Sequence, residues 1–106
     1  MSAREQVVEA SLQAAGVTAP RLTPEDVTAN IVDVEYVTHQ TKGGQVLRWA
    51  VITTKSGAAV TGRPSVSVSP ENDRPLIGMD VAYENARLEM WPLMGYALKE
   101  KLFTAT

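Results

Sequence analysis

Residues 46–54 read Val-Leu-Arg-Trp-Ala-Val-Ile-Thr-Thr, and this stretch decides the fold class. It is rich in β-branched and aromatic residues, which are enriched in strands. It is apolar on both faces apart from Arg48, and such a strand is typical of the middle of a sheet. We therefore predict that residues 46–54 form the central strand.

Alternating patterns on both sides of this segment predict its partner strands. Upstream, apolar residues alternate with acids in Val32-Asp33-Val34-Glu35-Tyr36, so we expect a half-buried strand that begins at Ile31. Downstream, Lys55-Ser56-Gly57 is a tight turn, after which residues 58–63 return as a third strand. Residues 65–69 alternate again and form either a fourth short strand or the tail of the third.

Helix signals occupy the two ends of the chain. Residues 4–15, with Ser2 as N-cap and Gly16 as a stop, predict a short helix, and a connector follows from Thr18. Thr23 and Pro24 predict the start of a second short helix over residues 24–30.

A long apolar face predicts a main C-terminal helix over residues 76–91. Pro92 removes one backbone donor and is expected to kink or break this helix. A second helical segment is expected over residues 93–103, where apolar spacing continues.

Together these elements predict an α+β fold in a single domain of 106 residues. A small antiparallel sheet of three or four strands is packed by a long kinked C-terminal helix and two short N-terminal helices. Residues 1–22 form the N-terminal helix and connector, and residues 23–103 form the core.

Composition excludes several classes of function. The chain has no cysteine and one histidine, His39, so disulfides, thiolate nucleophiles and zinc ribbons are excluded, as is a multi-histidine metal site within one chain. The net charge of −2 argues against a dedicated nucleic-acid-binding domain. The polar N-terminus and the lack of a long apolar run predict a cytoplasmic protein with no secretory signal and no membrane span.

One ridge of the predicted main helix carries candidate ligand-binding residues. Tyr83, Arg87 and Trp91 stand at i, i+4 and i+8, where a guanidinium can lie between two rings. Such a ridge can stack a base and neutralise a phosphate. The alternative is that the two rings are core or interface anchors and that Arg87 merely lies beside them.

Asn85 and Arg48 complete the candidate set. Asn85 sits inside a helix, where its propensity is poor, so it contacts a ligand, forms a hydrogen bond across an interface, or caps the loop between Ser65 and Pro75. Arg48 either pairs with an acid of the preceding strand or supplies a phosphate contact; the two candidate acids are Asp33 and Glu35. We predict no catalytic residue, no metal ligand and no cofactor.

The C-terminal half also carries a specific combination of short motifs. They are Ser69-Pro70-Glu71-Asn72, Ile77-Gly78, Ala82-Tyr83-Glu84-Asn85-Ala86, Trp91-Pro92-Leu93 and Gly95-Tyr96. On these motifs, residues 31–103 resemble the small phage-protein family named for gene product 49 of podophage N-four and gene 66 of phage Sf-six. Two departures are the absence of the family's usual aromatic near Asp73 and of its frequent cysteine.

The resemblance implies a phage or prophage accessory protein that acts in the host bacterial cytoplasm, and it implies no enzymatic activity. Our first hypothesis is an anti-defence protein that binds and sequesters a small anionic, nucleotide-like ligand between protomers, by analogy with small oligomeric phage proteins that sequester host signal nucleotides. The alternative is a homo-oligomeric interaction module that docks a host protein and has no small-molecule ligand. Nucleic-acid binding ranks third, and an enzyme is the least favoured.

Overall fold

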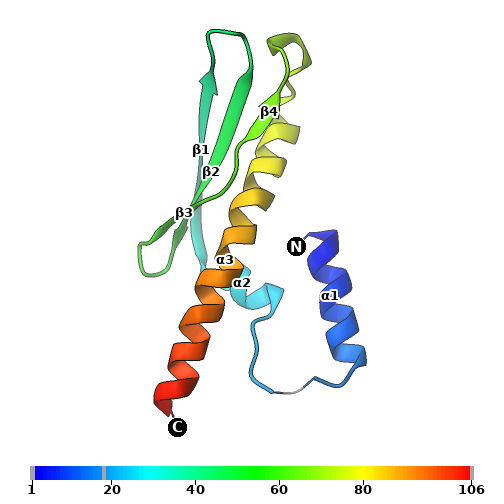
Figure 1. Ribbon diagram of the computed structural model, residues 1–106, viewed down its shortest axis with the longest axis vertical. Coiled ribbons are helices and arrows are strands. Elements are labelled where there is room, and N and C mark those ends of the chain that lie inside the picture. The colour runs from blue at the N-terminus through cyan, green and yellow to red at the C-terminus, as the bar shows by residue number, and fades with distance from the viewer. Residues whose placement is uncertain (1, 18, 106) are drawn as a thin grey trace.

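The computed structural model describes residues 2–17 and 19–105, and it confirms the predicted α+β class (Figure 1). Thr18, at the start of the predicted connector, lies outside the described residues. In chain order the elements are α1 (Ala3–Ala14), α2 (Pro24–Asn30), β1 (Ile31–Gln40), β2 (Val46–Thr54), β3 (Ala59–Thr61), β4 (Ser65–Ser67), the 3₁₀ turn η1 (Pro70–Asn72) and α3 (Pro75–Ala105).

The central position predicted for residues 46–54 is confirmed by the pairing of β2. One edge of β2 pairs antiparallel with β1, and the other edge pairs with β3 and then with β4. The alternation at Ser65–Ser67 therefore belongs to a separate fourth strand. The ladder between β1 and β2 has one irregularity, between Ile31 and Asp33.

Both predicted N-terminal caps are present. The Ser2 hydroxyl accepts a hydrogen bond from the Glu5 backbone N–H, and so satisfies one free donor of α1. Thr23 and Asp26 form a reciprocal capping box at the start of α2. Local side chains thus fix where both short helices begin.

Of the two outcomes expected at Pro92, a kink or a break, the break does not occur. Helix α3 runs without interruption from Pro75 to Ala105 and contains Pro92 in its interior. Proline leaves the carbonyl four residues earlier, at Leu88, without its helical donor. Leu88 and Pro92 are both on the exposed side of α3, so water can hydrate that carbonyl, while Met90 and Met94 hold the helix on the core.

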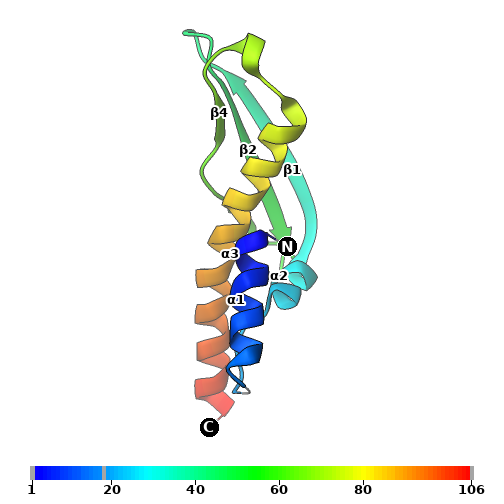
Figure 2. The same cartoon turned by 90° about the vertical axis from the view of Figure 1, so that its right-hand side faces the viewer.

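Helix α3 covers one face of the sheet (Figure 2). Alternate residues of β2 are buried, and Ala50 and Ile52 pack there against Ala82 and Ala86 of α3. The buried core cluster consists of Val27, Ala50, Ile52, Val60, Ala82, Ala86 and Met90.

The molecule is elongated, and this leaves much apolar surface in contact with water. Its radius of gyration is 16.6 Å, and its extents are 54 × 31 × 19 Å. A compact chain of this length has a radius of about 13 Å. The C-terminal turns of α3 extend past the end of the sheet (Figure 1). Along this helix Leu93, Tyr96 and Phe103 are 57%, 70% and 74% exposed.

Candidate functional site

The structure brings three of the five predicted site residues together around one buried guanidinium. Arg87 is 1% exposed, and its Nε donates to both carboxylate oxygens of Glu5, at 3.0 and 2.8 Å. Its Nη1 donates to the Tyr83 hydroxyl at 3.2 Å, and its Nη2 donates to the Pro24 carbonyl at 2.9 Å. The Trp91 indole N–H donates to Glu5 at 3.1 Å. We call these five residues the Arg87 cluster.

The charges of the Arg87 cluster balance within it. Burial alone raises the pKa of Glu5, but hydrogen bonds from Arg87 and Trp91 outweigh it and hold this pKa below its ordinary value. Burial alone lowers the pKa of Arg87, and the bonds to Glu5 and Tyr83 raise it above its ordinary value. Both groups are therefore ionised at neutral pH, and the cation already has an anionic partner.

The Arg87 cluster joins three segments that are far apart in the sequence. Glu5 comes from α1, Pro24 begins α2, and Tyr83 and Trp91 lie one turn before and after Arg87 on α3. The two aromatic side chains pack against the core, as the anchor interpretation expected, but Arg87 is fully buried and does not lie along the surface. The contacts of the Arg87 cluster thus hold α1 against α3.

Arg48 lies in a second ion pair, away from the Arg87 cluster. Its Nη1 and Nη2 donate to the two carboxylate oxygens of Asp73 at 2.6 and 2.7 Å, and the Ser67 hydroxyl donates to the same carboxylate at 3.0 Å. The hydrogen bond from Arg48 lowers the pKa of Asp73 below its ordinary value. The pair ties β2 to the segment that precedes α3.

The prediction that Arg48 pairs with Asp33 or Glu35 is wrong. The two acids are the cross-strand partners of Thr53 and Val51, whose side chains lie on the face of β2 opposite to that of Arg48. Cross-strand neighbours share a face, so these acids point away from the arginine.

Asn85 has a structural contact of its own, separate from both ion pairs. Its Nδ2 donates to the carbonyl of Arg63 at 3.0 Å, just before the loop that it was expected to cap. The chain passes very close to α3 here, because a Cβ at Gly62 would lie 2.8 Å from the Ala86 backbone nitrogen. Asn85 thus holds the link between β3 and β4 against α3.

The two carboxylates that bind the arginines were missed by the sequence reasoning. Glu5 is assigned from the sequence only to the short N-terminal helix, and Asp73 only to a departure from a family pattern. Neither stands at a helical or cross-strand spacing from its arginine, since they are separated by 82 and 25 residues. Within the described residues, no group of three or more His, Asp or Glu side chains is placed to hold a metal ion.

A family model described as phage protein (N4 Gp49/phage Sf6 gene 66) family matches residues 22–102 of the 106-residue chain. The chain belongs to this phage protein family. No curated protein and no solved structure matches it significantly. The match confirms the resemblance seen in the motifs of the C-terminal half.

The part matched to the phage protein family includes the five predicted site residues, whereas α1 precedes it. Glu5 is therefore the one residue of the Arg87 cluster that lies outside the matched segment.

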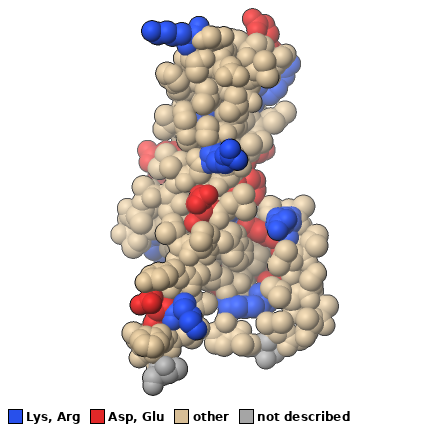
Figure 3. All heavy atoms as spheres, in the orientation of Figure 1, with Lys and Arg blue, Asp and Glu red and all other residues tan. Residues whose placement is uncertain are grey.

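Charged side chains of both signs are dispersed over the face seen in Figure 3, with no continuous patch of either sign. No helix that the structure describes combines the length and the hydropathy needed to cross a bilayer.

Proposed function

We propose that this phage protein is a non-catalytic interaction module that acts in the host bacterial cytoplasm as a homodimer. The observation that carries the proposal is an apolar strip on the sheet face turned away from α3. We call it the outer strip, and its residues are Val37, Leu47, Trp49, Val51 and Val66.

The outer strip follows from strand pairing. The buried residues of β2 face α3, so Leu47, Trp49 and Val51 between them lie on the opposite face, where each is half-buried. Val37 of β1 stands opposite Trp49, and Val66 of β4 stands opposite Leu47. The two valines are 51% and 55% exposed, so an apolar surface crosses three strands without a covering layer in the described residues.

A second copy of the chain fits this surface. Apolar sheet faces pack on one another about 10 Å apart, and a two-fold dimer uses the same patch on both subunits. The four strands have 10, 9, 3 and 3 residues, so at about 3.3 Å per residue and 4.8 Å between strands this sheet face measures roughly 400 Å² per copy. Two copies together then bury roughly 800 Å², the size of a weak interface whose dimer forms at high protein concentration.

The acids beside the outer strip favour one orientation of that dimer. Asp33 and Glu35 lie on the same sheet face, at the end of β1 nearest α2. A two-fold axis along the strands would gather the four carboxylates of the two copies at one end of the interface. An axis across the strands near Trp49 places them at opposite ends, so we infer antiparallel stacking.

Sequestration of a nucleotide-like anion stays a prediction, but the contacts around the candidate residues give it less support. This prediction uses Arg48 and Arg87 to neutralise the negative charge of the ligand, but each arginine already binds a carboxylate. A ligand phosphate would have to displace Asp73 or Glu5 from a charge-assisted hydrogen bond. A thermal-shift screen with cyclic and linear nucleotides tests this alternative directly.

The dimer is tested by measuring the mass in solution over a range of concentrations. We expect twice 11.5 kDa for the wild type. Val37→Lys and Val66→Lys each place a charge in the outer strip, and we expect about a ten- to hundredfold weaker dimer. Val7→Lys is the matched control, because Val7 is similarly exposed but lies on α1, and it should leave the dimer unchanged.

Two results would overturn the proposal. The first is a wild-type monomer at high micromolar concentration, in which case retention of a host protein in a pull-down would favour hetero-docking instead. The second is a dimer that Val37→Lys and Val66→Lys leave intact, which would place the interface elsewhere.

A further inference from the structure

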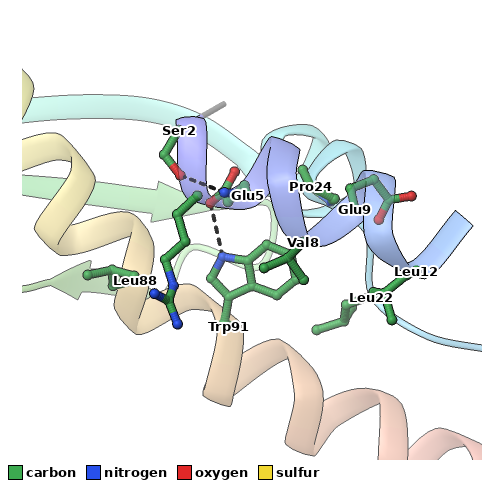
Figure 4. A pocket seen from close by; sticks show the side chains of 10 residues that line it. Ser2, Glu5, Val8, Glu9, Leu12, Leu22, Pro24, Leu88 and Trp91 are labelled. Carbon is green, nitrogen blue, oxygen red and sulfur yellow. Dashed lines mark hydrogen bonds between the residues drawn. The ribbon is translucent and has the colours of Figure 1, made fainter. Parts of the chain in front are cut away.

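A cleft of about 310 Å³ separates α1 from α3 (Figure 4). Val8 and Leu12 of α1 form one wall, Leu88 and Trp91 of α3 form the other, and Leu22 of the connector lies between them. Figure 4 shows Val8 beside the Trp91 ring and Leu12 beside Leu22. The walls of the cleft are thus aliphatic and aromatic.

The Arg87 cluster joins α1 to α3 at one end of this cleft. Trp91 is fixed by its hydrogen bond to Glu5, and Glu5 is fixed by Arg87, so α1 is anchored to α3 at its first turns. Beyond this anchor the facing side chains do not fill the gap, since Val8 is 48% and Leu88 is 56% exposed. The volume of this open cleft is at the lower end of the range for small-molecule sites.

The charges around the cleft select the kind of ligand. Two carboxylates line it, and each is neutralised by an arginine outside the lining: Glu5 by Arg87, and Glu9 by Arg21 through contacts of 2.7 and 2.9 Å. Arg4 also lines the cleft, and no carboxylate among the described residues pairs with it. The charge left to recognise a ligand is therefore positive.

From this combination we propose that the cleft binds an amphipathic anion with a single hydrocarbon chain. The chain lies between Val8, Leu88 and Trp91, and the carboxylate end lies toward Arg4. This site is independent of the outer strip and of dimer formation.

The test is calorimetric titration of the full-length protein with dodecanoate below its micelle concentration. Dodecanol and dodecyltrimethylammonium serve as neutral and cationic probes with the same chain. We expect saturable binding of dodecanoate, weaker binding of dodecanol and the weakest binding of the cation. Vesicles of phosphatidylglycerol form a separate arm, which distinguishes a free single-chain anion from a lipid surface.

Matched variants test whether dodecanoate binds in this cleft. Val8→Asp puts a carboxylate into the cleft wall, and we expect about tenfold or greater loss of dodecanoate affinity. Val7→Asp is its control, because Val7 is the adjacent residue of α1, is 66% exposed and does not line the cleft. Arg4→Gln should remove most of the preference for dodecanoate over dodecanol.

The proposal is overturned if dodecanoate does not bind, if it binds no better than the cation, or if Val7→Asp weakens binding as much as Val8→Asp. Binding to vesicles without binding of the free anion would also overturn it. Because both valines are exposed, neither variant is expected to unfold the protein, and circular dichroism verifies this.

Discussion

Replacement of Glu5 by glutamine removes the carboxylate from the Arg87 cluster but keeps the size of the side chain. Arg87 then remains buried as a cation whose nearest partners, the Tyr83 hydroxyl and the Pro24 carbonyl, are neutral. Removal of one partner from a buried ion pair costs about 3–5 kcal/mol, because the remaining charge is uncompensated. We expect a loss near the lower end, about 3 kcal/mol, since those two acceptors remain and water reaches Arg87 once α1 moves away.

Urea unfolding followed by circular dichroism measures this loss of unfolding free energy. The double variant Glu5→Gln/Arg87→Met removes both charges and keeps an apolar side chain of similar length, so it should recover most of the stability. A loss below about 1 kcal/mol for Glu5→Gln, the range of an exposed pair, would refute the reasoning. It would mean that α1 does not bury the guanidinium.

The same pair predicts a pH dependence with a definite sign. The pKa of Glu5 in the folded state lies below its ordinary value of 4.5, which it regains on unfolding. The unfolded state therefore binds more protons in this range, and the stabilisation is complete above the unfolded pKa and is lost as the pH falls through the folded one. Below about pH 5 the difference in stability between wild type and Glu5→Gln should shrink. A constant difference down to strongly acidic pH would contradict this.

Three further substitutions test the packing around α3 by urea unfolding. Asp73→Asn should lower the midpoint, because Arg48 loses its bidentate ionic partner; an unchanged midpoint would show that the pair does not hold β2 to the start of α3. Gly62→Ala should cost about 1–3 kcal/mol through contact with the α3 backbone, whereas Gly43→Ala, which meets only one side-chain atom at 3.8 Å, should change little. Met90→Ala should cost about 2–5 kcal/mol by leaving a cavity in the core, and a loss below that range would show that the site collapses on truncation.

Element types and helix starts were predictable because their causes are local. The capping hydroxyls of Ser2 and Thr23 and the alternation around β2 each act within a few residues of the structure they fix. The central position of β2 followed from its lack of a polar face. These signals need no knowledge of which distant segments meet.

The two ion pairs could not be predicted in the same way. A local rule pairs Arg48 with an acid of the neighbouring strand, but register decides which face a side chain occupies, and register was unknown. The pairing of Glu5 with Arg87 depends on the docking of α1 across 82 residues of sequence. The sequence around Glu5 does not distinguish it from a solvent-exposed glutamate, because its burial depends on the packing of α1 against α3.

Pro92 shows a different limit. The sequence gives the local cost of a proline inside a helix, about 3 kcal/mol, which favours a break. It does not give the packing on either side. Met90 is fully buried before Pro92, Met94 packs on the core after it, and these contacts keep the helix continuous.

The two proposals rest on different parts of the chain, so one pair of variants separates them. The outer strip lies on strands within the segment matched to the phage protein family, whereas the cleft needs α1, which precedes that segment. Glu5→Gln loosens α1 and should weaken dodecanoate binding without changing the dimer. Val37→Lys should do the reverse, because Val37 lies on the sheet face turned away from α3. If either variant weakened both dimer and ligand binding, the sheet face and the cleft would be coupled, and their assignment as independent sites would be wrong.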